Sequence, residues 1–117
     1  MKRLTLFFPV LMLVACATPQ DLVGRPDAVS FSLAMSAQAA EQQVAGAWLE
    51  HSSAVSVVPI SGGFMLCLTH PTAGTDVAVQ ILEAHGGCTV RYGMRARAFS
   101  PEWMESPLLK LRASAVK

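Results

Sequence analysis

From residue 54 to residue 98 the chain reads AVSVVPISGGFMLCLTHPTAGTDVAVQILEAHGGCTVRYGMRARA. Valine-rich and alternating apolar residues in this stretch indicate β-strands. Two pairs of glycines, at 62–63 and 86–87, indicate tight hairpin turns, and a proline and a glycine break the pattern again between 71 and 75. The stretch therefore predicts four consecutive antiparallel strands that form a meander.

Upstream of this meander the hydrophobic period changes from that of a strand to that of a helix. Apolar and polar residues alternate over 29–33, which predicts one further strand. Between residues 33 and 51 apolar residues recur at steps of three and four, which predicts an amphipathic helix with Ser36 as its N-cap. Trp48 falls on the inner side of that helix, so we expect it in the core.

Downstream of the meander, Ser100-Pro101-Glu102 predicts a short C-terminal helix with a serine N-cap and proline at the first helical position. Pro107 should interrupt or restart this helix, because proline lacks the backbone N–H. The predicted order is therefore β-α-β-β-β-β-α. It indicates a single α+β domain over residues 28–117, in which one helix packs on an antiparallel meander of four to five strands.

The N-terminal residues have the pattern of an export signal. Lys2 and Arg3 precede an apolar run of about ten residues, which is too short to span a bilayer. The motif Leu13-Val14-Ala15-Cys16 follows, and it resembles the lipobox of bacterial lipoproteins. The resemblance covers residues 1–16. It implies that residues 1–15 are removed as a signal peptide, that the Cys16 thiol carries diacylglycerol, and that the new amino group is acylated, typically by palmitate.

The same resemblance implies a location for the protein. Several acyl chains on Cys16 would hold it on a membrane more firmly than a single chain can. Ala17 stands where an aspartate would resemble the signal for retention in the inner membrane, so the predicted location is the outer membrane, facing the periplasm. Residues 16–27 contain two prolines and a glycine without a sustained period, and we expect them to be a lipidated tether.

The net charge and the number of cysteines limit the possible partners and predict a covalent link. Removal of the leader takes Lys2 and Arg3 from the nine cations and leaves all eight acids, so the mature chain has a net charge of −1. A nearly neutral chain argues against nucleic acid as a partner. Cys67 and Cys88 remain as an even pair in an oxidising compartment, which predicts a disulfide between them.

The sequence shows no pattern typical of an enzyme. The Gly-x-Ser-x-Gly motif of a nucleophile elbow is absent, and no two of His51, His70 and His85 stand at the spacing of metal ligands. Glu41 and Glu50 are nine residues apart and do not form a carboxylate pair on one turn of a helix. We therefore predict a non-enzymatic protein without a metal or cofactor.

Arginines at the last predicted strand are the most unusual surface feature. Arg91, Arg95 and Arg97 share one parity, so they are expected to project from one face of the sheet. That face is either simply solvated, or it binds an anionic partner such as lipid headgroups, lipopolysaccharide phosphates or an acidic protein surface. Trp103, on the predicted C-terminal helix, either caps the core or anchors a partner.

Residues 42–46, QQVAG, match the Gln-x-Val-x-Gly motif of cystatins, whose order of strands and helix is similar to the one predicted here. This resemblance covers five residues and implies cysteine-protease inhibition and a cystatin-like topology. Two departures accompany it. The motif falls within the predicted helix instead of a hairpin turn, and Glu102 separates Pro101 from Trp103, the two residues near the expected later loop.

These observations predict a membrane-anchored lipoprotein that acts as a structural or accessory binding module in an envelope assembly. It would dock through the arginine-bearing face of the sheet or through the exposed edge of the meander. The alternative is a small-ligand or protease-inhibitor-like module that uses the concave side of the sheet. The sequence leaves the identity of the partner and the oligomeric state open.

Overall fold

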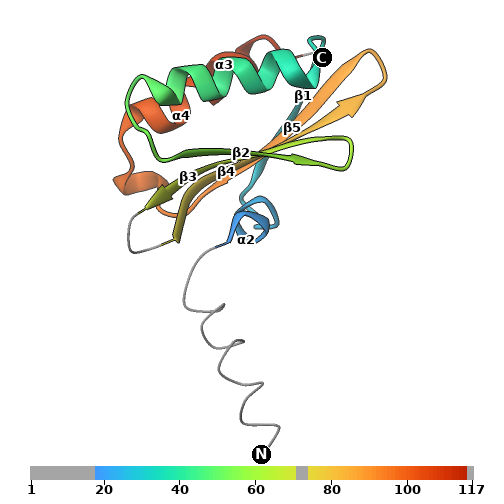
Figure 1. Ribbon diagram of the computed structural model, residues 1–117. Helices are drawn as coiled ribbons and strands as arrows, with labels where there is room; N and C mark the ends of the chain where they lie inside the picture. Colours follow the sequence, from blue (N-terminus) through green and yellow to red (C-terminus); the bar gives the residue numbers. More distant parts are fainter. Residues whose placement is uncertain (1–17, 71–73, 116–117) are drawn as a thin grey trace, which may run out of the picture.

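The structure, a computed structural model, describes residues 18–70 and 74–115 (Figure 1). The elements in chain order are α2 (Pro19–Val23), β1 (Val29–Leu33), α3 (Ala37–Leu49), β2 (Val55–Ile60), β3 (Gly63–His70), β4 (Gly74–Ala84), β5 (Gly87–Met94), the 3-10 helix η1 (Arg97–Phe99) and α4 (Glu102–Ala113). The predicted α+β class and element order are confirmed, and α2 is an addition to that order. The predicted leader and Cys16 lie outside the described residues.

The strands form one antiparallel sheet in the order β1-β5-β4-β3-β2. Strands β2 to β5 make the predicted meander, in which each strand pairs with the next. Its two predicted hairpin turns are confirmed. Gly62 and Gly86 adopt φ angles of 83° and 80° there, a region that glycine enters readily because it has no Cβ. Since β1 pairs with β5, β2 is left at the opposite edge of the sheet.

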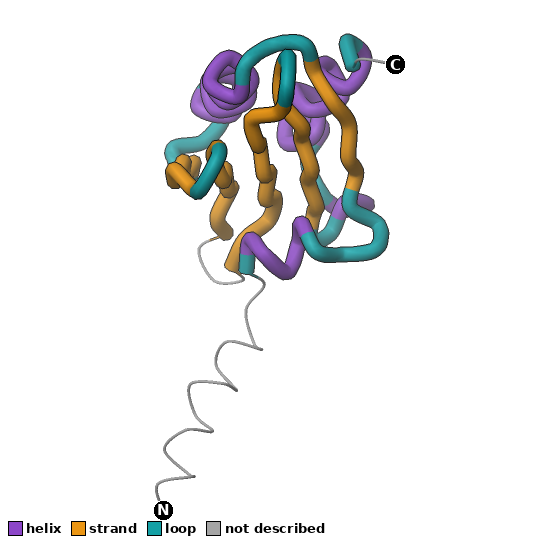
Figure 2. The backbone as a smooth tube through the Cα atoms, turned by 90° about the vertical axis from the view of Figure 1, so that its right-hand side faces the viewer, coloured by secondary structure: helices purple, strands orange, loops and turns teal. Residues whose placement is uncertain are grey.

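Helices α3 and α4 cover one face of the sheet, and α2 lies against the other (Figures 1 and 2). The core lies between the sheet and these two helices. Its largest buried side chains are Trp48 of α3, Leu108 of α4, and Leu66, Ile81 and Tyr92 of the sheet. Trp48 is fully buried, as predicted, and its Nε1 donates to the carbonyl oxygen of Met104 at 2.8 Å. This bond joins α3 to α4 and satisfies the indole N–H inside the core.

Helix α3 begins where the sequence predicts. Ser36 is its N-cap, and the Ser36 Oγ accepts a hydrogen bond from the Ala39 amide at 3.1 Å. Glu83 of β4 satisfies a second amide at this end, because its Oε1 accepts from Ala37 at 2.9 Å. Residues 42–46, which match the cystatin motif, lie inside α3 and therefore do not form a hairpin turn.

Helix α4 differs from its predicted form in two ways. It begins at Glu102, one residue later than predicted, because the Ser100 Oγ donates to the backbone four residues earlier instead of capping the helix. Pro107 lies inside the helix, so the prediction that it interrupts or restarts the helix is wrong. Burial of two leucines, one directly after Pro107 and one a turn later, offsets the hydrogen bond that Pro107 cannot make. They are Leu108 and Leu111.

Helix α2 replaces part of the predicted tether. Thr18 and Asp21 form a capping box, in which each backbone amide donates to the other side chain, at 3.3 and 3.2 Å. Leu22 and Val23 are buried against the sheet. The prediction that residues 16–27 are a tether is therefore wrong for α2, because a single helical turn held by two apolar side chains shows no period in the sequence.

Candidate functional site

Cys67 and Cys88 are free thiols on opposite faces of the sheet. Cys67 packs beneath α2, whereas Cys88 belongs to the core under α3 and α4. Their pairing partners on β4, Ala78 and Glu83, are five residues or about 17 Å apart along the strand. A disulfide needs Cα atoms within about 7 Å and side chains that point toward each other. The structure thus contradicts the predicted disulfide.

Both thiols are also weak nucleophiles. Burial raises the pKa of Cys67. Burial, and after it the negative charge of Glu83, raises the pKa of Cys88. The thiolate is the reactive and metal-binding form of cysteine, and a raised pKa makes it scarce at neutral pH. These two cysteines therefore have the environment of core residues.

The three arginines of the predicted binding surface do not share a face. Strand β5 ends before Arg95, so only Arg91 belongs to the strand, on the α2 side. Arg95 pairs with Asp76 at the end of the sheet, and Arg97, in η1, pairs with Glu105 of α4 at 3.3 Å. The predicted arginine-bearing face is therefore wrong, because the alternation of the strand stops before the second arginine.

Arg91 and Arg25 hold α2 on the sheet. The Arg91 guanidinium donates to the carbonyl oxygens of Val23 and Arg25 and, through Nη1, to the Ser30 Oγ at 2.8 Å. In the opposite direction, Arg25 Nη1 donates to the carbonyl oxygen of Met94 at 2.9 Å. The Arg91 bonds satisfy carbonyl groups at the C-terminal end of α2, and the Arg25 bond satisfies one at the end of β5. The arginine that the sequence assigned to a partner thus binds its own domain.

Trp103 packs at the edge of the core and stacks on His51, with ring centroids 5.0 Å apart and planes inclined by 12°. Of the two alternatives for Trp103, the structure supports core capping. His51, His70 and His85 lie after α3, at the end of β3 and in the β4–β5 turn. Among residues 18–70 and 74–115 no group of three or more potential metal ligands occurs.

Tyr92 and Glu105 form a polar contact inside the core. The Tyr92 hydroxyl donates to Glu105 Oε2 at 2.7 Å, and Arg97 contacts the same carboxylate. Burial, followed by the hydrogen bond to Glu105, raises the pKa of the fully buried Tyr92 above its usual value. The phenol therefore keeps its proton at alkaline pH values where an unfolded tyrosine loses it, and its hydrogen bond joins β5 to α4.

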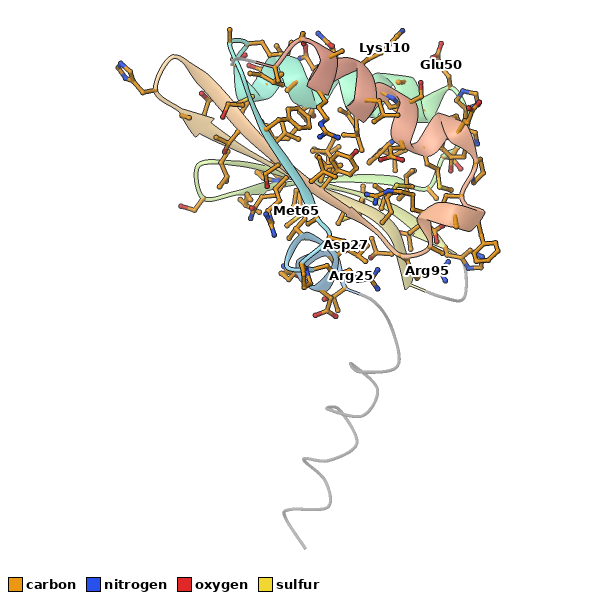
Figure 3. The ribbon with its side chains drawn as sticks, turned by 180° about the vertical axis from the view of Figure 1, so that it is seen from behind. Arg25, Asp27, Glu50, Met65, Arg95 and Lys110 are labelled. Carbon is orange, nitrogen blue, oxygen red and sulfur yellow. The ribbon has the colours of Figure 1, made fainter. Side chains whose placement is uncertain are left out.

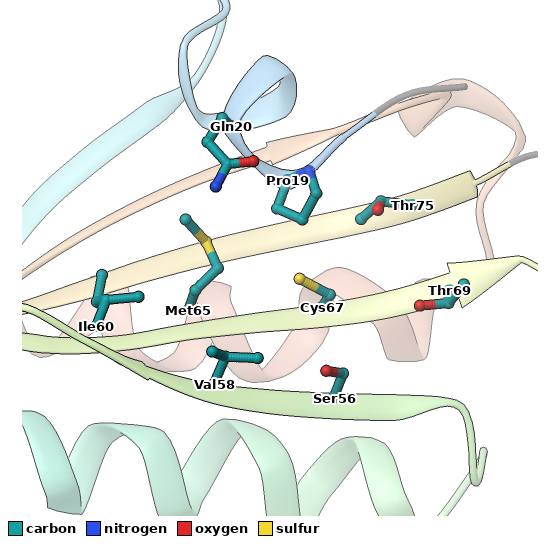
Figure 4. A pocket seen from close by; sticks show the side chains of 9 residues that line it. All are labelled: Pro19, Gln20, Ser56, Val58, Ile60, Met65, Cys67, Thr69 and Thr75. Atoms are coloured by element: carbon teal, nitrogen blue, oxygen red, sulfur yellow. The ribbon is translucent and has the colours of Figure 1, made fainter. Parts of the chain in front are cut away.

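A groove of about 260 Å³ lies on the α2 side of the sheet (Figure 4). Met65 and Cys67 of β3 form its floor, Val58 and Ile60 of β2 line one side, and Pro19 of α2 lines the other. The polar residues of the lining are Gln20, Ser56, Thr69 and Thr75. The groove is therefore mainly apolar, with threonine hydroxyls at one end. The sequence could not reveal this groove, because one of its walls is the unpredicted helix α2.

Strand β2 borders this groove and forms a free edge, since no strand of the described residues pairs with its outer side. The Thr69 amide donates to the Ala54 carbonyl oxygen at 3.2 Å, so alternate residues from Ala54 onward bond to β3. The intervening residues, which direct their backbone groups outward, are Val55, Val57 and Pro59. The strand carries no charge, and Val57 and Val58 are 36% and 49% exposed.

A second cavity, of about 410 Å³, lies at the end of the sheet where β4 begins and β5 ends. Asp76 and Arg95 line it and neutralise each other across its wall. Phe99 of η1 lines the same cavity and is 91% exposed, the largest exposed fraction among the large hydrophobic side chains of the described residues. This end of the sheet therefore presents an aromatic ring to solvent beside an internally satisfied ion pair.

Comparison with known proteins adds no relative. No family model matches this chain, and neither a curated protein nor a solved structure matches it. Within residues 18–70 and 74–115, no helix has the length and apolar character needed to cross a membrane. A functional proposal therefore rests on the N-terminal motif and on the geometry of the groove and the free edge of β2.

Proposed function

We propose that this chain is a lipoprotein of the bacterial envelope, held at the periplasmic face of the outer membrane by acyl chains on Cys16. The lipobox-like motif Leu13-Val14-Ala15-Cys16 supports the anchor. The position of the domain is compatible with it, because α2 begins at Pro19, three residues after the cysteine. Acyl chains on one terminal residue would leave the whole α+β domain outside the lipid.

The domain acts as a non-enzymatic accessory module that binds an extended segment of an envelope protein along β2. The observation that carries this proposal is the free, uncharged edge of β2 beside an apolar groove. Val57 directs an N–H and a C=O outward, which an added strand can pair with. Val57 and Val58 point to opposite faces of the strand, so the added strand would cover apolar surface on both.

Two further observations favour the β2 edge over other surfaces. The arginines are bonded within the domain, so the edge is the remaining docking surface of the two that the sequence suggested. Soluble proteins commonly protect sheet edges with charged residues, and β2 has none. Pro59 removes only one of the outward N–H groups, which shortens the region available for pairing without closing it.

Photo-crosslinking in cells tests this binding mode. A photo-reactive amino acid replaces Val58, which is 49% exposed on β2, or Leu109, which is 48% exposed on α4 and serves as the matched control. We expect a defined protein adduct from position 58 and none from position 109. In combination with Val57→Pro, which removes an outward N–H that β3 does not use, the adduct should fall about ten-fold.

The control for that substitution is the melting temperature, which Val57→Pro should leave nearly unchanged because the lost N–H points away from the sheet. An adduct that is equally strong at positions 58 and 109, or one that Val57→Pro leaves intact in a folded protein, would contradict binding along β2.

The anchor is tested separately by the intact mass of protein purified from native membranes. The expected mass is that of residues 16–117 with diacylglycerol and an amide-linked acyl chain on Cys16, and Cys16→Ala should leave the leader uncleaved and the protein without lipid. A mature chain of the unmodified mass would contradict the lipoprotein assignment. The β2 experiment would still be informative in that case, because it depends on the domain alone.

The groove itself supports a second candidate, a small apolar ligand. Its mainly apolar lining and a volume of about 260 Å³ match a ligand somewhat smaller than typical drug-sized molecules. Native mass spectrometry of the purified domain should then show a bound adduct that is lost in Met65→Arg, a change that places a charge on the floor of the groove. A ligand-free spectrum under the mildest conditions argues for the protein-binding mode alone.

A further inference from the structure

Phe99 is exposed at a place where the fold gives it no packing role. Its side chain is 91% exposed on the short η1 helix, whereas Phe31, Phe64 and Trp103 pack against the core. A phenylalanine in water loses the free energy that burial would contribute. A ring held at the tip of a short, structured segment is therefore suited to enter an apolar phase outside the domain.

Phe99 lies at the end of the sheet to which α2 is attached. Arg25, just after α2, donates to the carbonyl oxygens of Met94 and Arg95, at 2.9 and 3.3 Å. Arg95 and Phe99 then line one cavity. In Figure 3, Arg25 and Arg95 lie at the same end of the domain as α2. The first described residue, Thr18, thus belongs to the end of the molecule that carries Phe99.

A lipid on Cys16 would bring this end of the domain close to the bilayer. Two peptide units separate Cys16 from Thr18, and they span at most about 7 Å when fully extended. Because the capping box and the buried Leu22 fix α2 to the sheet, the domain has no long tether at this point. An anchor at Cys16 therefore limits both the height and the tilt of the domain above the membrane.

We propose that the α2 end of the domain is a membrane-contact surface and that Phe99 inserts into the interfacial region of the same leaflet that holds the acyl chains. This inference rests on the proposed lipid anchor. The occupant of the surface is the lipid interface itself. Phe99 adds a second, apolar contact to the covalent anchor and fixes the orientation of the domain, so that the β2 edge lies at a defined height for its partner.

Charge on this surface argues for insertion of the ring as the main contact. Arg95 is neutralised by Asp76, and Arg97 by Glu105. Arg25 binds backbone carbonyl oxygens, which reduces the freedom of its guanidinium to reach lipid phosphates. The contact should therefore depend little on salt or on the fraction of anionic lipid.

A site-specific fluorescent dye tests the contact on the lipidated, full mature protein in phosphatidylcholine vesicles. Three variants each carry one new cysteine for the dye. The first replaces Phe99, and the two controls replace Leu49 or Leu109, which are 59% and 48% exposed on other helices. Cys67 and Cys88 are buried with a raised pKa, so the new thiol reacts with the dye first. The degree of labelling of the unsubstituted protein measures the background.

We expect the dye at position 99 to gain fluorescence in vesicles and to be quenched by lipids brominated near the headgroup, with the same result in 0.5 M salt as in ~0.05 M salt. The dyes at positions 49 and 109 should change little. Equal quenching at all three positions, or none at position 99 in protein whose mass includes the acyl chains, overturns this inference alone. An acyl-free mass overturns the lipid anchor and this inference with it.

Discussion

The two faces of the sheet are stabilised by different means. The face under α3 and α4 buries a continuous set of large apolar side chains around Trp48 and Tyr92. The opposite face is covered only in part, by a single turn of helix that Leu22, Val23 and two arginines hold in place. Stability against global unfolding should therefore come mainly from the first face, and local opening should begin on the second.

The less covered face is also the one that carries the proposed binding surface. The groove and the free edge of β2 both lie where α2 stops covering the sheet. A surface that is covered by few contacts can admit a partner at a small cost in native packing, whereas the α3 and α4 face cannot. The four predictions that follow test the comparison between the two faces.

The largest effect is expected from Trp48→Ala. The substitution removes a fully buried indole and its bond to the Met104 carbonyl oxygen, so the free energy of unfolding should fall by about 3–5 kcal/mol. Denaturant titration measures the loss. Leu109→Ala, at an exposed position of α4, is the control and should change the stability by less than about 0.5 kcal/mol. A similar small loss for both would show that the first face does not dominate stability.

Arg91→Met should release α2 while the rest of the domain stays folded. The lost bonds to the carbonyl oxygens of Val23 and Arg25 should lower the free energy of local opening by about 1–3 kcal/mol. Hydrogen exchange should then accelerate at the amides of α2 and remain slow in α3. Arg97→Met removes a more exposed ion pair and should change exchange by about 1 kcal/mol or less. Uniform acceleration across both faces after Arg91→Met would contradict local opening.

Tyr92 makes stability depend on alkaline pH. The unfolded tyrosine releases its proton near pH 10, whereas the raised pKa keeps the folded phenol protonated, so above about pH 10 the unfolded state binds fewer protons. The free energy of unfolding should therefore fall as the pH rises, by at most about 1.4 kcal/mol per pH unit from this residue.

Tyr92→Phe should remove this contribution, which denaturant titrations at several pH values between about 9 and 12 can measure. The raised pKa values of Cys67 and Cys88 also lower stability at alkaline pH, but they act equally in both proteins and cancel in the difference. Identical slopes for the two proteins would show that the pKa of Tyr92 is not raised in the folded state.

The smallest effect concerns the rates at which the two thiols react. In the folded protein at neutral pH, Cys67 and Cys88 should both react slowly with a thiol reagent. In the denatured chain both should react quickly, without addition of a reducing agent. Arg91→Met should speed the reaction of Cys67, which lies beneath α2, and leave Cys88 unchanged. If neither thiol reacts until a reductant is present, the cysteines are oxidised and the disulfide must be reconsidered.

Much of the fold was predictable because it depends on local patterns in the sequence. Alternation and glycine pairs define the strands and turns of the meander, and Ser36 with the helical period defines α3. The burial of Trp48 follows from the same period. In contrast, α2 was missed, because its one turn is stabilised by contacts with β4 and β5 that have no trace in a short sequence window.

The candidate site was predictable only in outline. The sequence suggested an exposed edge of the meander, and the free edge of β2 is consistent with this. It also suggested an arginine face and a disulfide, and both were wrong. Parity along a strand does not tell where the strand ends, and an even number of cysteines does not tell on which face of the sheet each thiol lies.

By itself the sequence determined the class of the fold, the two hairpins, the core helix and a motif that resembles a lipobox, because each depends on residues close together in the chain. Only the tertiary structure decided that β1 pairs with β5, that the cysteines lie on opposite faces, and that Arg91 binds the backbone at the C-terminal end of α2 instead of a partner. These outcomes depend on contacts between residues far apart in sequence, whose partners are selected by the packing of the whole domain.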